Sequence, residues 1–544
     1  MKIEIFGSML LRARMLQRWV VPLALIGCRP AERPTATGVP LYDNLGRFHV
    51  GITTTSDKAQ RFFDQGMRLA YAFNHAEAVA SFEAAARLDP RCAMCQWAIA
   101  YALGPNINAP MDSAAGAGAA AAIGQARTLA AGASDRERDF IEAMATRYSA
   151  DPMAPRPPLD SAFAVAMAGL AAKYPGDLEA ATIHADALMN LRPWDYWAGI
   201  GRPYPGTAVL VAELERVMAA DSTHPGACHL FIHAIEATEP ARAVGCAERL
   251  AALMPGAGHL VHMPSHIYVR IGRYQEAIDH NHHAAHADSA LSAADRISPT
   301  YAALYVSHNY HFLGFAALLS GQAELGIRAA QRTAATMPPA EAIQLPEYQP
   351  LVAFEHLMLQ KFGRWDQVLA LPLPDSSLPV GRAVAEYARG TALAATGRFE
   401  EAEALLPVIG RRAEGSYSPI AKGIVELAAH SLAGELAGRR GQWAAAERAF
   451  RSAMAIEDGF TYMEPPWWIE PVRHPLGALL LRAGKAAAAE VVFREDLVRF
   501  PANVWSLVGL RESLAAQGKP SAEIAAQAAA AVTQAGHDPK VAHY

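Results

Sequence analysis

The sequence has no excess of positive charge and none of the short motifs that mark the commonest catalytic sites. It has 48 Lys and Arg residues against 53 Asp and Glu residues, with a formal net charge of -5. Proteins that bind nucleic acid need a basic surface to neutralise phosphates, so we expect no nucleic-acid partner. No nucleophile elbow, P-loop or H-E-x-x-H motif is present. The stretch that begins Gly116-Ala117-Gly118 follows no apolar strand, so we interpret it as the start of an Ala-rich helix and not as a dinucleotide site.

Cysteine is also scarce, with five residues: Cys28, Cys92, Cys95, Cys228 and Cys246. Cys92 and Cys95 have C-x-x-C spacing, but a lone pair supplies only two of the four thiolates of a structural zinc site. No βαβ pattern typical of a thioredoxin surrounds the pair. We therefore expect a local disulfide or two buried thiols here, in preference to a redox centre.

Long apolar runs are absent except near the N-terminus, where residues 19–26 follow three arginines. A membrane span takes about 20 apolar residues, so this run is too short to be one. Basic residues before a short apolar stretch predict a secretory signal, which we assign to residues 1–28. A buried N-terminal helix is the alternative interpretation.

The segment Leu25-Ile26-Gly27-Cys28 resembles a bacterial lipobox. This resemblance implies that Cys28 becomes the lipidated first residue of the mature chain, and that residues 29–54 form a tether. We therefore expect an exported protein, either periplasmic or held at a membrane by the lipid anchor alone. The other four cysteines would then lie in an oxidising compartment, where disulfides persist.

The hydrophobic content, 52%, is ample for a packed core, and the apolar residues repeat. Ala78, Phe82, Ala85 and Pro90 follow Gly66 by 12, 16, 19 and 24 residues. In such a grid the small residues let two antiparallel helices approach, the aromatic residue fills the space between units, and Pro ends the second helix. Because one helix pair cannot bury its apolar face alone, neighbouring pairs must stack. The grid recurs, complete or in part, in later units that begin at Gly390, Gly434 and Gly477.

These spacings resemble the 34-residue tetratricopeptide repeat over most of residues 55–535. The resemblance implies an all-α fold, an α-solenoid of helix pairs that forms a right-handed superhelix with a concave groove. We divide it into an N-terminal repeat region at 55–150, a degenerate histidine-rich region at 151–330 and a C-terminal repeat region at 331–544. Three stretches rich in Pro and Trp are expected to be loops that decorate or plug the solenoid: Asp151–Asp160, Leu191–Gly206 and Ile456–Pro475.

Histidines are concentrated in the middle region, since 12 of the 20 lie between His224 and His311. Two pairs, His229/His233 and His262/His266, have i,i+4 spacing, which places two imidazoles on one helix face. Such pairs are typical of sites for zinc, copper or iron. Glu236 would share the face of the first pair. Pro264 could open a helix at its first position and thereby break the geometry of the second pair.

The tetratricopeptide resemblance also implies which histidines converge, because repeat positions 2, 5 and 9 line the concave groove of these proteins. Adjacent first helices pack about 8–10 Å apart, so imidazoles from neighbouring units can reach a common ion. We place eight histidines in the groove: His184, His229, His233, His259, His262, His266, His308 and His311. A second group is expected on the convex, solvated side: His280, His282, His283 and His286. His474 would approach the groove only if the superhelix closes.

We therefore predict a transition-metal site. Its candidate ligands are His229, His233, His262, His266, Glu236, His308, His311 and His184. Imidazole ligation in an exported protein favours copper or zinc, and iron is possible if Glu236 joins. Five aromatic residues either wall a substrate pocket or anchor loops: Trp194, Tyr196, Trp197, Trp467 and Trp468.

Two functions remain open at this stage. One is a metal-binding protein or metal-dependent enzyme, of unknown catalytic residues and small-molecule substrate, in which an open coordination site activates water or dioxygen. The other is a non-catalytic scaffold that binds a partner protein or peptide in its groove. Segments beginning Asn74-His75, Gly104-Pro105 and His262-Met263 resemble a widespread set of exported, histidine-rich bacterial repeat proteins, a resemblance that implies no reaction.

Overall fold

The computed structural model describes residues 38–151, 154–293, 296–415, 417–537 and 539. The expected signal segment, with Cys28 and the first part of the tether, lies outside the described residues. Within them the chain forms helices and no strand, only two isolated β-bridges. No helix among the described residues is both long and apolar enough to cross a bilayer.

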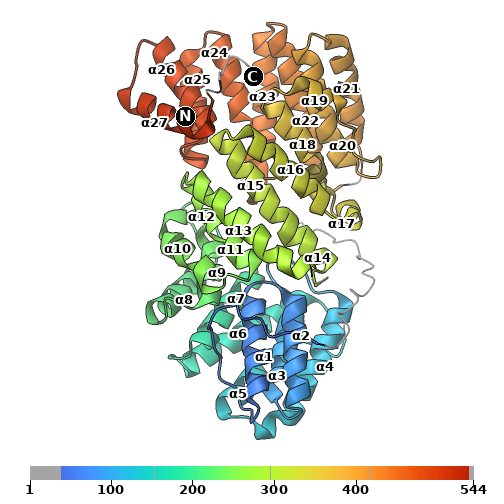
Figure 1. Cartoon of the computed structure of the whole chain (residues 1–544), viewed down its shortest axis with the longest axis vertical. Coiled ribbons are helices and arrows are strands. Elements are labelled where there is room, and N and C mark those ends of the chain that lie inside the picture. The colour runs from blue at the N-terminus through green and yellow to red at the C-terminus, as the bar shows by residue number, and fades with distance from the viewer. Residues whose placement is uncertain (1–37, 152–153, 294–295, 416, 538, 540–544) are drawn as a thin grey trace, which may run out of the picture.

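The helices run in order from one end of an elongated molecule to the other (Figure 1). They are α1 (Asp57–Tyr71), α2 (His75–Leu88), α3 (Ala93–Leu103), α4 (Ser113–Leu129), α5 (Asp135–Ala145), α6 (Arg156–Lys173), α7 (Leu178–Asn190), α8 (Thr207–Ala220), α9 (Pro225–Ile235), α10 (Val244–Leu253), α11 (Gly258–His262), α12 (Pro264–Arg270), α13 (Tyr274–Ala293), α14 (Pro299–Tyr301), α15 (Ser307–Ser320), α16 (Ala323–Thr336), α17 (Pro339–Gln344), α18 (Phe354–Lys361), α19 (Trp365–Ala370), α20 (Pro379–Ala395), α21 (Phe399–Arg412), α22 (Pro419–Arg439), α23 (Trp443–Gly459), α24 (Arg473–Arg482), α25 (Ala486–Arg499), α26 (Val504–Ala516) and α27 (Ala522–Ala535).

Consecutive helices pack as pairs, and in three of them a glycine faces a phenylalanine of the partner helix: Gly66 and Phe82, Gly434 and Phe450, and Gly477 and Phe493. A Cβ atom added at Gly66 of α1 would lie 2.3 Å from a ring carbon of Phe82 on α2. Gly477 of α24 and Phe493 of α25 repeat this arrangement at 2.5 Å. The close approach therefore depends on the missing side chain, as the sequence grid predicts. The all-α tetratricopeptide-type solenoid is confirmed by these pairs.

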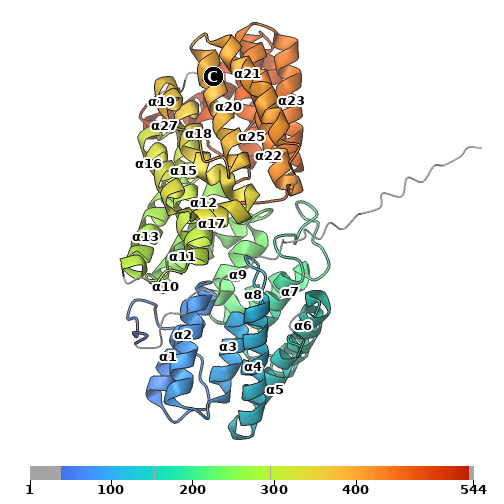
Figure 2. The same cartoon turned by 90° about the vertical axis from the view of Figure 1, so that its right-hand side faces the viewer.

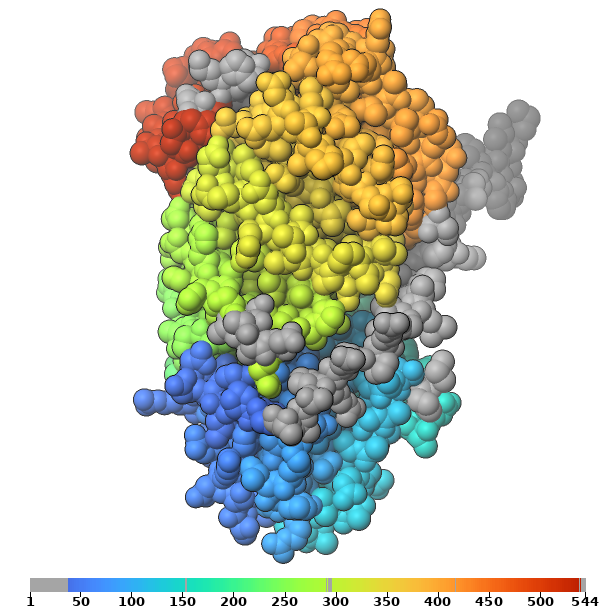
Figure 3. Space-filling model, turned by 45° about the vertical axis from the view of Figure 1, so that its right-hand side comes forward, coloured from blue at the N-terminus to red at the C-terminus, as the bar shows by residue number. Residues whose placement is uncertain are grey.

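The C-terminal end of the solenoid folds back onto its middle. Trp505 of α26 donates a hydrogen bond from Nε1 to the Leu318 carbonyl of α15, at 2.7 Å. The Tyr274 hydroxyl donates to the carbonyl of Pro501, at 2.6 Å. Figure 2 shows the C-terminal helices above α12 and α15, and Figure 3 shows the N-terminal units at the opposite end of the surface. Because of this closure, the loop before α24 lies over the central helices.

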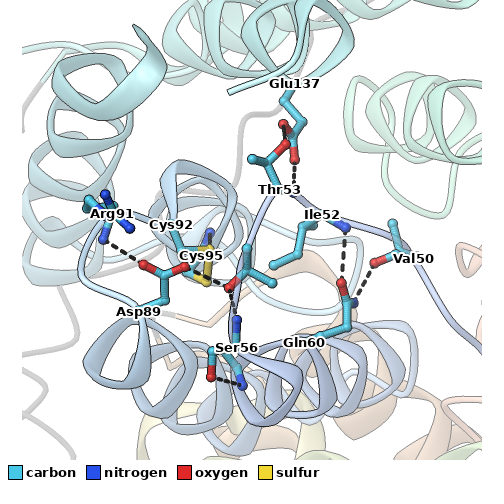
Figure 4. Close-up of a disulfide and its surroundings, with 12 residues drawn as sticks. Val50, Ile52, Thr53, Ser56, Gln60, Asp89, Arg91, Cys92, Cys95 and Glu137 are labelled. Carbon is cyan, nitrogen blue, oxygen red and sulfur yellow. Dashed lines mark hydrogen bonds between the residues drawn. A yellow bond between two sulfur atoms is a disulfide. The ribbon is translucent and has the colours of Figure 1, made fainter. Parts of the chain in front are cut away.

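The segment from residue 38 to residue 56, the N-terminal strap, is packed against the first helices and not held away from them as the expected tether would be. The Val50 N–H donates to Asp64. Thr53 donates from both its N–H and its hydroxyl to Glu137 (Figure 4). The strap is fixed because a buried carboxylate accepts each of these donors. Beside it, Cys92 and Cys95 form a disulfide, one of the two predicted alternatives. A second disulfide joins Cys228 of α9 to Cys246 of α10.

Two of the three predicted loops differ from the structure at their ends. The stretch Leu191–Gly206 is irregular between α7 and α8, as predicted. The other two predicted loops, Asp151–Asp160 and Ile456–Pro475, are partly helical, since α6 begins at Arg156, α23 continues to Gly459 and α24 begins at Arg473. Proline is tolerated in these first turns because their N–H groups have no helical partner to lose. The stretch from Gly116 lies in α4, which starts at Ser113, as the Ala-rich helix interpretation predicts.

Candidate metal centre

Four helix segments bring histidines together in the middle of the molecule. His229 and His233 lie on α9, whose last turn is followed by Glu236. The other imidazoles come from α11, α12 and α15: His259, His262, His266 and His308. All except His308, which is half-buried, are at most 3% exposed, and Glu236 is fully buried. Helix packing thus gathers, among apolar side chains, residues that are rarely buried without partners.

Pro264 does not separate the second pair of imidazoles. Met263, between α11 and α12, keeps right-handed helical angles of φ -50° and ψ -35°, so the two short helices follow one axis. The rings of His262 and His266 have centroids 4.8 Å apart, and their Nε2 atoms are 2.9 Å apart. The i,i+4 geometry is therefore kept across the proline.

Hydrogen bonds define which nitrogen of His262 carries a proton. Its Nδ1 lies 2.6 Å from Oδ1 of Asn281 on α13. The Asn281 amide nitrogen donates to the Ala277 carbonyl and to the Ser265 hydroxyl, which fixes the amide so that its oxygen faces His262. Since Oδ1 only accepts, His262 Nδ1 is the donor. In the neutral ring, the Nε2 lone pair of His262 then points at His266.

Glu236 holds one imidazole from each i,i+4 pair. Its Oε1 is 3.1 Å from Nδ1 of His233, and its Oε2 is 2.5 Å from Nδ1 of His266. Despite the burial of this carboxyl, the neighbouring His266 and His233 lower its pKa to about 2, so it is ionised. His233 Nδ1 donates to Oε1, so Nε2 of His233 is free to accept, whereas Nδ1 of His266 lies beside Oε2 at an ion-pair distance without hydrogen-bond geometry. No hydrogen-bond partner within the described part of the chain reaches Nε2 of His233.

His229, the other imidazole of α9, is oriented in the same way as His233. His229 Nδ1 is 2.7 Å from the carbonyl oxygen of Tyr71, so this nitrogen donates. Its Nε2 lies 3.1 Å from Nε2 of His259. Nδ1 of His259 is buried and without a hydrogen-bond partner among the described residues. Three imidazoles thus have Nδ1 hydrogen-bonded to an oxygen acceptor, which leaves Nε2 to accept: His229, His233 and His262.

Burial keeps His229, His259 and His262 neutral. Desolvation holds the pKa values of His229, His259 and His262 well below the usual range, and nearby imidazoles add to the shift. A neutral imidazole is the form that binds a metal, and a second-sphere acceptor on its other nitrogen fixes tautomer and orientation. Three groups within the described residues have ligand atoms within 4.8 Å of one another: His229/His233/His259, His262/His266/His308 and His233/Glu236/His266.

A pocket opens onto the cluster. It holds a cavity of about 110 Å³, against roughly 10–15 Å³ needed for one water molecule, so it admits a small molecule. His233, His259, His266 and His308 lie in its wall together with His311. Its aromatic lining comes from two loops and three helical segments: Trp194, Tyr305, Tyr348, Phe354, Trp467 and Trp468.

The aromatic residues singled out in the sequence have different positions. Trp194, Trp467 and Trp468 line the pocket. Trp194 has a positive φ of 63°, which is strained for a residue with a side chain, and its ring meets His233 edge-on at 4.9 Å. Trp197 anchors its loop instead, because its Nε1 donates to the Ala234 carbonyl. Tyr196 is buried outside the pocket wall.

Two candidate ligands lie outside the three-residue groups of the cluster. His184 on α7 faces Glu213 of α8, at 2.8 Å between Nδ1 and Oε2. His311 contacts the Phe354 ring and reaches the pocket, where burial lowers its pKa to about 3. His474 pairs with Asp496 at 2.9 Å and lies outside the pocket wall, although the superhelix does close.

Four other histidines of the middle region lie on α13, whereas His224 precedes α9 and pairs with Glu179 at 2.9 Å. His282, His283 and His286 are exposed, and His280 is half-buried with its Nδ1 3.1 Å from the Val261 carbonyl. The repeat register predicts that His259 lies in the groove but does not single it out as a ligand, although the structure makes it part of a three-imidazole group. No sequence spacing gives a signal for Asn281, because this residue comes from another helix.

The sequence matches no protein-family model and no curated relative. Among similar solved structures, the human IFIT1 dimer with m7Gppp-AAAA is 12% identical over 89% of this chain and 91% of that chain, with a TM-score of 0.34. Yeast Tom70 is 8% identical over 85% and 90% of the two chains, with a TM-score of 0.30. The P58(IPK) TPR domain is 14% identical over 67% and 95%, with a TM-score of 0.19. Such values carry no functional argument. The chain is a tetratricopeptide-type solenoid on the evidence of its own helix pairs.

Proposed function

We propose that this solenoid binds a transition metal in its central histidine cluster and presents the metal to a small molecule in the adjoining pocket. One observation carries the proposal. His262 has a proton on Nδ1, Nδ1 of His266 lies 2.5 Å from the ionised Glu236, and the Nε2 atoms of the two rings face one another at 2.9 Å. The negative charge of Glu236 favours a proton on Nδ1 of His266, which leaves two lone pairs facing one another. Two lone pairs at this distance repel unless a cation or an extra proton lies between them.

A metal ion resolves this contact better than a proton does. An extra proton would create a buried imidazolium, and burial already disfavours the charged form of His262. Two imidazole nitrogens about 2.0–2.1 Å from a tetrahedral zinc lie about 3.3 Å apart, close to the 2.9 and 3.1 Å seen for the two Nε2 pairs. The donors are therefore spaced for a shared ion.

The ligand chemistry favours copper or zinc, because the inward-facing donors are imidazoles. Iron becomes the better candidate if Glu236 turns from its hydrogen-bonding position to coordinate. Three protein ligands leave a coordination position for water or substrate, which is the arrangement of catalytic metal sites. A metal-dependent enzyme acting on a small molecule with an apolar body fits the aromatic wall of the pocket.

We also propose that the protein works outside the cytosol. The two disulfides support export, because such bonds persist mainly in oxidising compartments. The lipobox-like segment supports attachment through a lipid on Cys28. Labelling of expressing cells with a radioactive fatty acid tests this attachment. Label is expected in the intact protein and should disappear in Cys28→Ala.

Elemental analysis of protein purified without chelators tests the metal proposal. Near-stoichiometric copper, zinc or iron is expected in the wild type, with less in His229→Ala and His262→Ala. His283→Ala is the matched control, because this histidine is exposed on α13. A folded, metal-free wild type that cannot be loaded afterwards would instead favour the non-catalytic scaffold with a peptide in its groove.

A further inference from the structure

The inward-facing imidazoles form two groups with no residue in common. The first group, His229, His233 and His259, comes from α9 and α11. The second group, His262, His266 and His308, comes from α11, α12 and α15. In each group the ligand atoms lie within 4.8 Å of one another. Each group alone supplies the three imidazoles that a catalytic zinc or copper site uses.

We infer that the cluster is a dinuclear centre, in which each three-imidazole group holds one ion. This inference rests on the proposed metal function and adds the number of ions and their division between the groups. The first group is His229, His233 and His259, and the second is His262, His266 and His308.

Contacts within each group support one ion per group. In the first group the ring centroid of His229 lies 4.8 Å from that of His233 and 4.9 Å from that of His259. In the second group the ring of His262 lies 4.8 Å from that of His266 and 4.7 Å from that of His308. Each group also contains one close Nε2 pair, at 3.1 Å in the first and at 2.9 Å in the second. The two groups are therefore built alike.

Glu236 explains how two cations can be tolerated side by side in a buried place. This carboxylate touches both groups, through Nδ1 of His233 and Nδ1 of His266. The centroids of these two rings are 5.3 Å apart, so the groups adjoin. A negative charge shared between the two groups offsets part of the repulsion between two ions. Glu236 is thus a positioning residue for one ligand of each ion.

The pocket reaches both groups at once. His233 and His259 of the first group and His266 and His308 of the second lie in its wall. A small molecule with an oxygen or nitrogen donor can therefore meet both ions from one side. Two-metal sites use this arrangement to hold the attacking and leaving atoms of one reaction. The class of ligand we assign to the centre is such a bridging donor.

Zinc titration of metal-free protein, followed by native mass spectrometry, tests the inference. Wild-type protein is expected to take up two zinc ions. His229→Ala and His308→Ala should each retain one ion, and the double variant should retain none. His283→Ala, the exposed control on α13, should retain two. Circular dichroism establishes that each variant is folded, and His259→Gln replaces His229→Ala if the latter fails to fold.

The outcomes separate this inference from the proposed function. Uptake of a single ion by the wild type would overturn the dinuclear centre and leave a mononuclear metal site. Loss of both ions in either single variant would also overturn it, because the two groups would not bind separately. No uptake by folded wild type would overturn the proposed metal function itself.

Discussion

Replacement of Glu236 by glutamine is the most informative perturbation of the centre. The wild-type carboxylate has an oxygen for each of two rings, at 3.1 Å from His233 Nδ1 and 2.5 Å from His266 Nδ1. Glutamine has one oxygen and one amide NH2 group of nearly the same size. Whichever way the amide lies, one ring meets a donor. That ring must carry its proton on Nε2, the nitrogen needed for the metal.

The magnitude follows from the second-sphere position of this residue. Loss of such a partner costs about 10–100-fold in metal affinity, which is roughly 1.4–2.7 kcal/mol per ion. Glu236 is fully buried, so solvent does not screen the loss of its charge. We expect the ion whose ligand ring meets the NH2 group to weaken by at least this factor. The other ion should weaken less, through the lost charge alone.

Competition with a chromophoric zinc chelator near neutral pH measures these affinities. Glu213→Gln is the matched control, because Glu213 also faces a histidine, His184, but lies outside the cluster. The control should bind zinc as the wild type does. Unchanged affinity in Glu236→Gln, with the fold intact by circular dichroism, would refute the assignment of Glu236 to the metal centre.

Three further predictions concern stability, each measured by urea unfolding followed by circular dichroism. Gly66→Ala should destabilise the first helix pair by about 1–3 kcal/mol through overpacking. Gly124→Ala in α4, where an added Cβ meets nothing within 4 Å, should stabilise the protein by about 0.5–1 kcal/mol. Equal effects of the two substitutions would contradict the packing account. Burial raises the pKa of Asp288 to about 7, so the folded state binds its proton more tightly and the contribution of Asp288 to stability should fall as pH rises from about 4 to 7. Buried histidines with lowered pKa values, such as His259 and His311, give the opposite slope, so the readout is the difference in stability between Asp288→Asn and the wild type. This difference should shift in favour of the variant as pH rises, and a pH-independent difference would refute the assignment. Cys228→Ala with Cys246→Ala opens a bridge with a sequence separation of 18 residues and should cost about 3 kcal/mol, while no loss would mean that the bridge does not constrain the unfolded chain.

The sequence predicts the fold well because each repeat carries its own packing rule. Gly66 facing Phe82 is a local relation, set by helix periodicity and a short turn. The same periodicity predicts which face of α9 carries His229 and His233, since i,i+4 residues share a face. Helical register therefore gives the orientation of a side chain without knowledge of the rest of the chain.

What the sequence does not predict depends on contacts between distant segments. Asn281 fixes the proton of His262 from a different helix, and only the packing of α13 on α11 brings them together. His184 occupies a similar repeat position to the ligands but turns to Glu213, because a carboxylate on the next helix competes for it. The loop with Trp467 reaches the pocket through closure of the whole solenoid. Such contacts follow from the sum of many small rotations between units, which no local pattern contains.

Anomalous diffraction from crystals of zinc-loaded protein, recorded on both sides of the zinc absorption edge, tests the central claim most directly. The account predicts two anomalous peaks, one enclosed by the Nε2 atoms of His229, His233 and His259 and one by the imidazoles of His262, His266 and His308. Peaks confined to the exposed histidines of α13, with none inside the cluster, would contradict it.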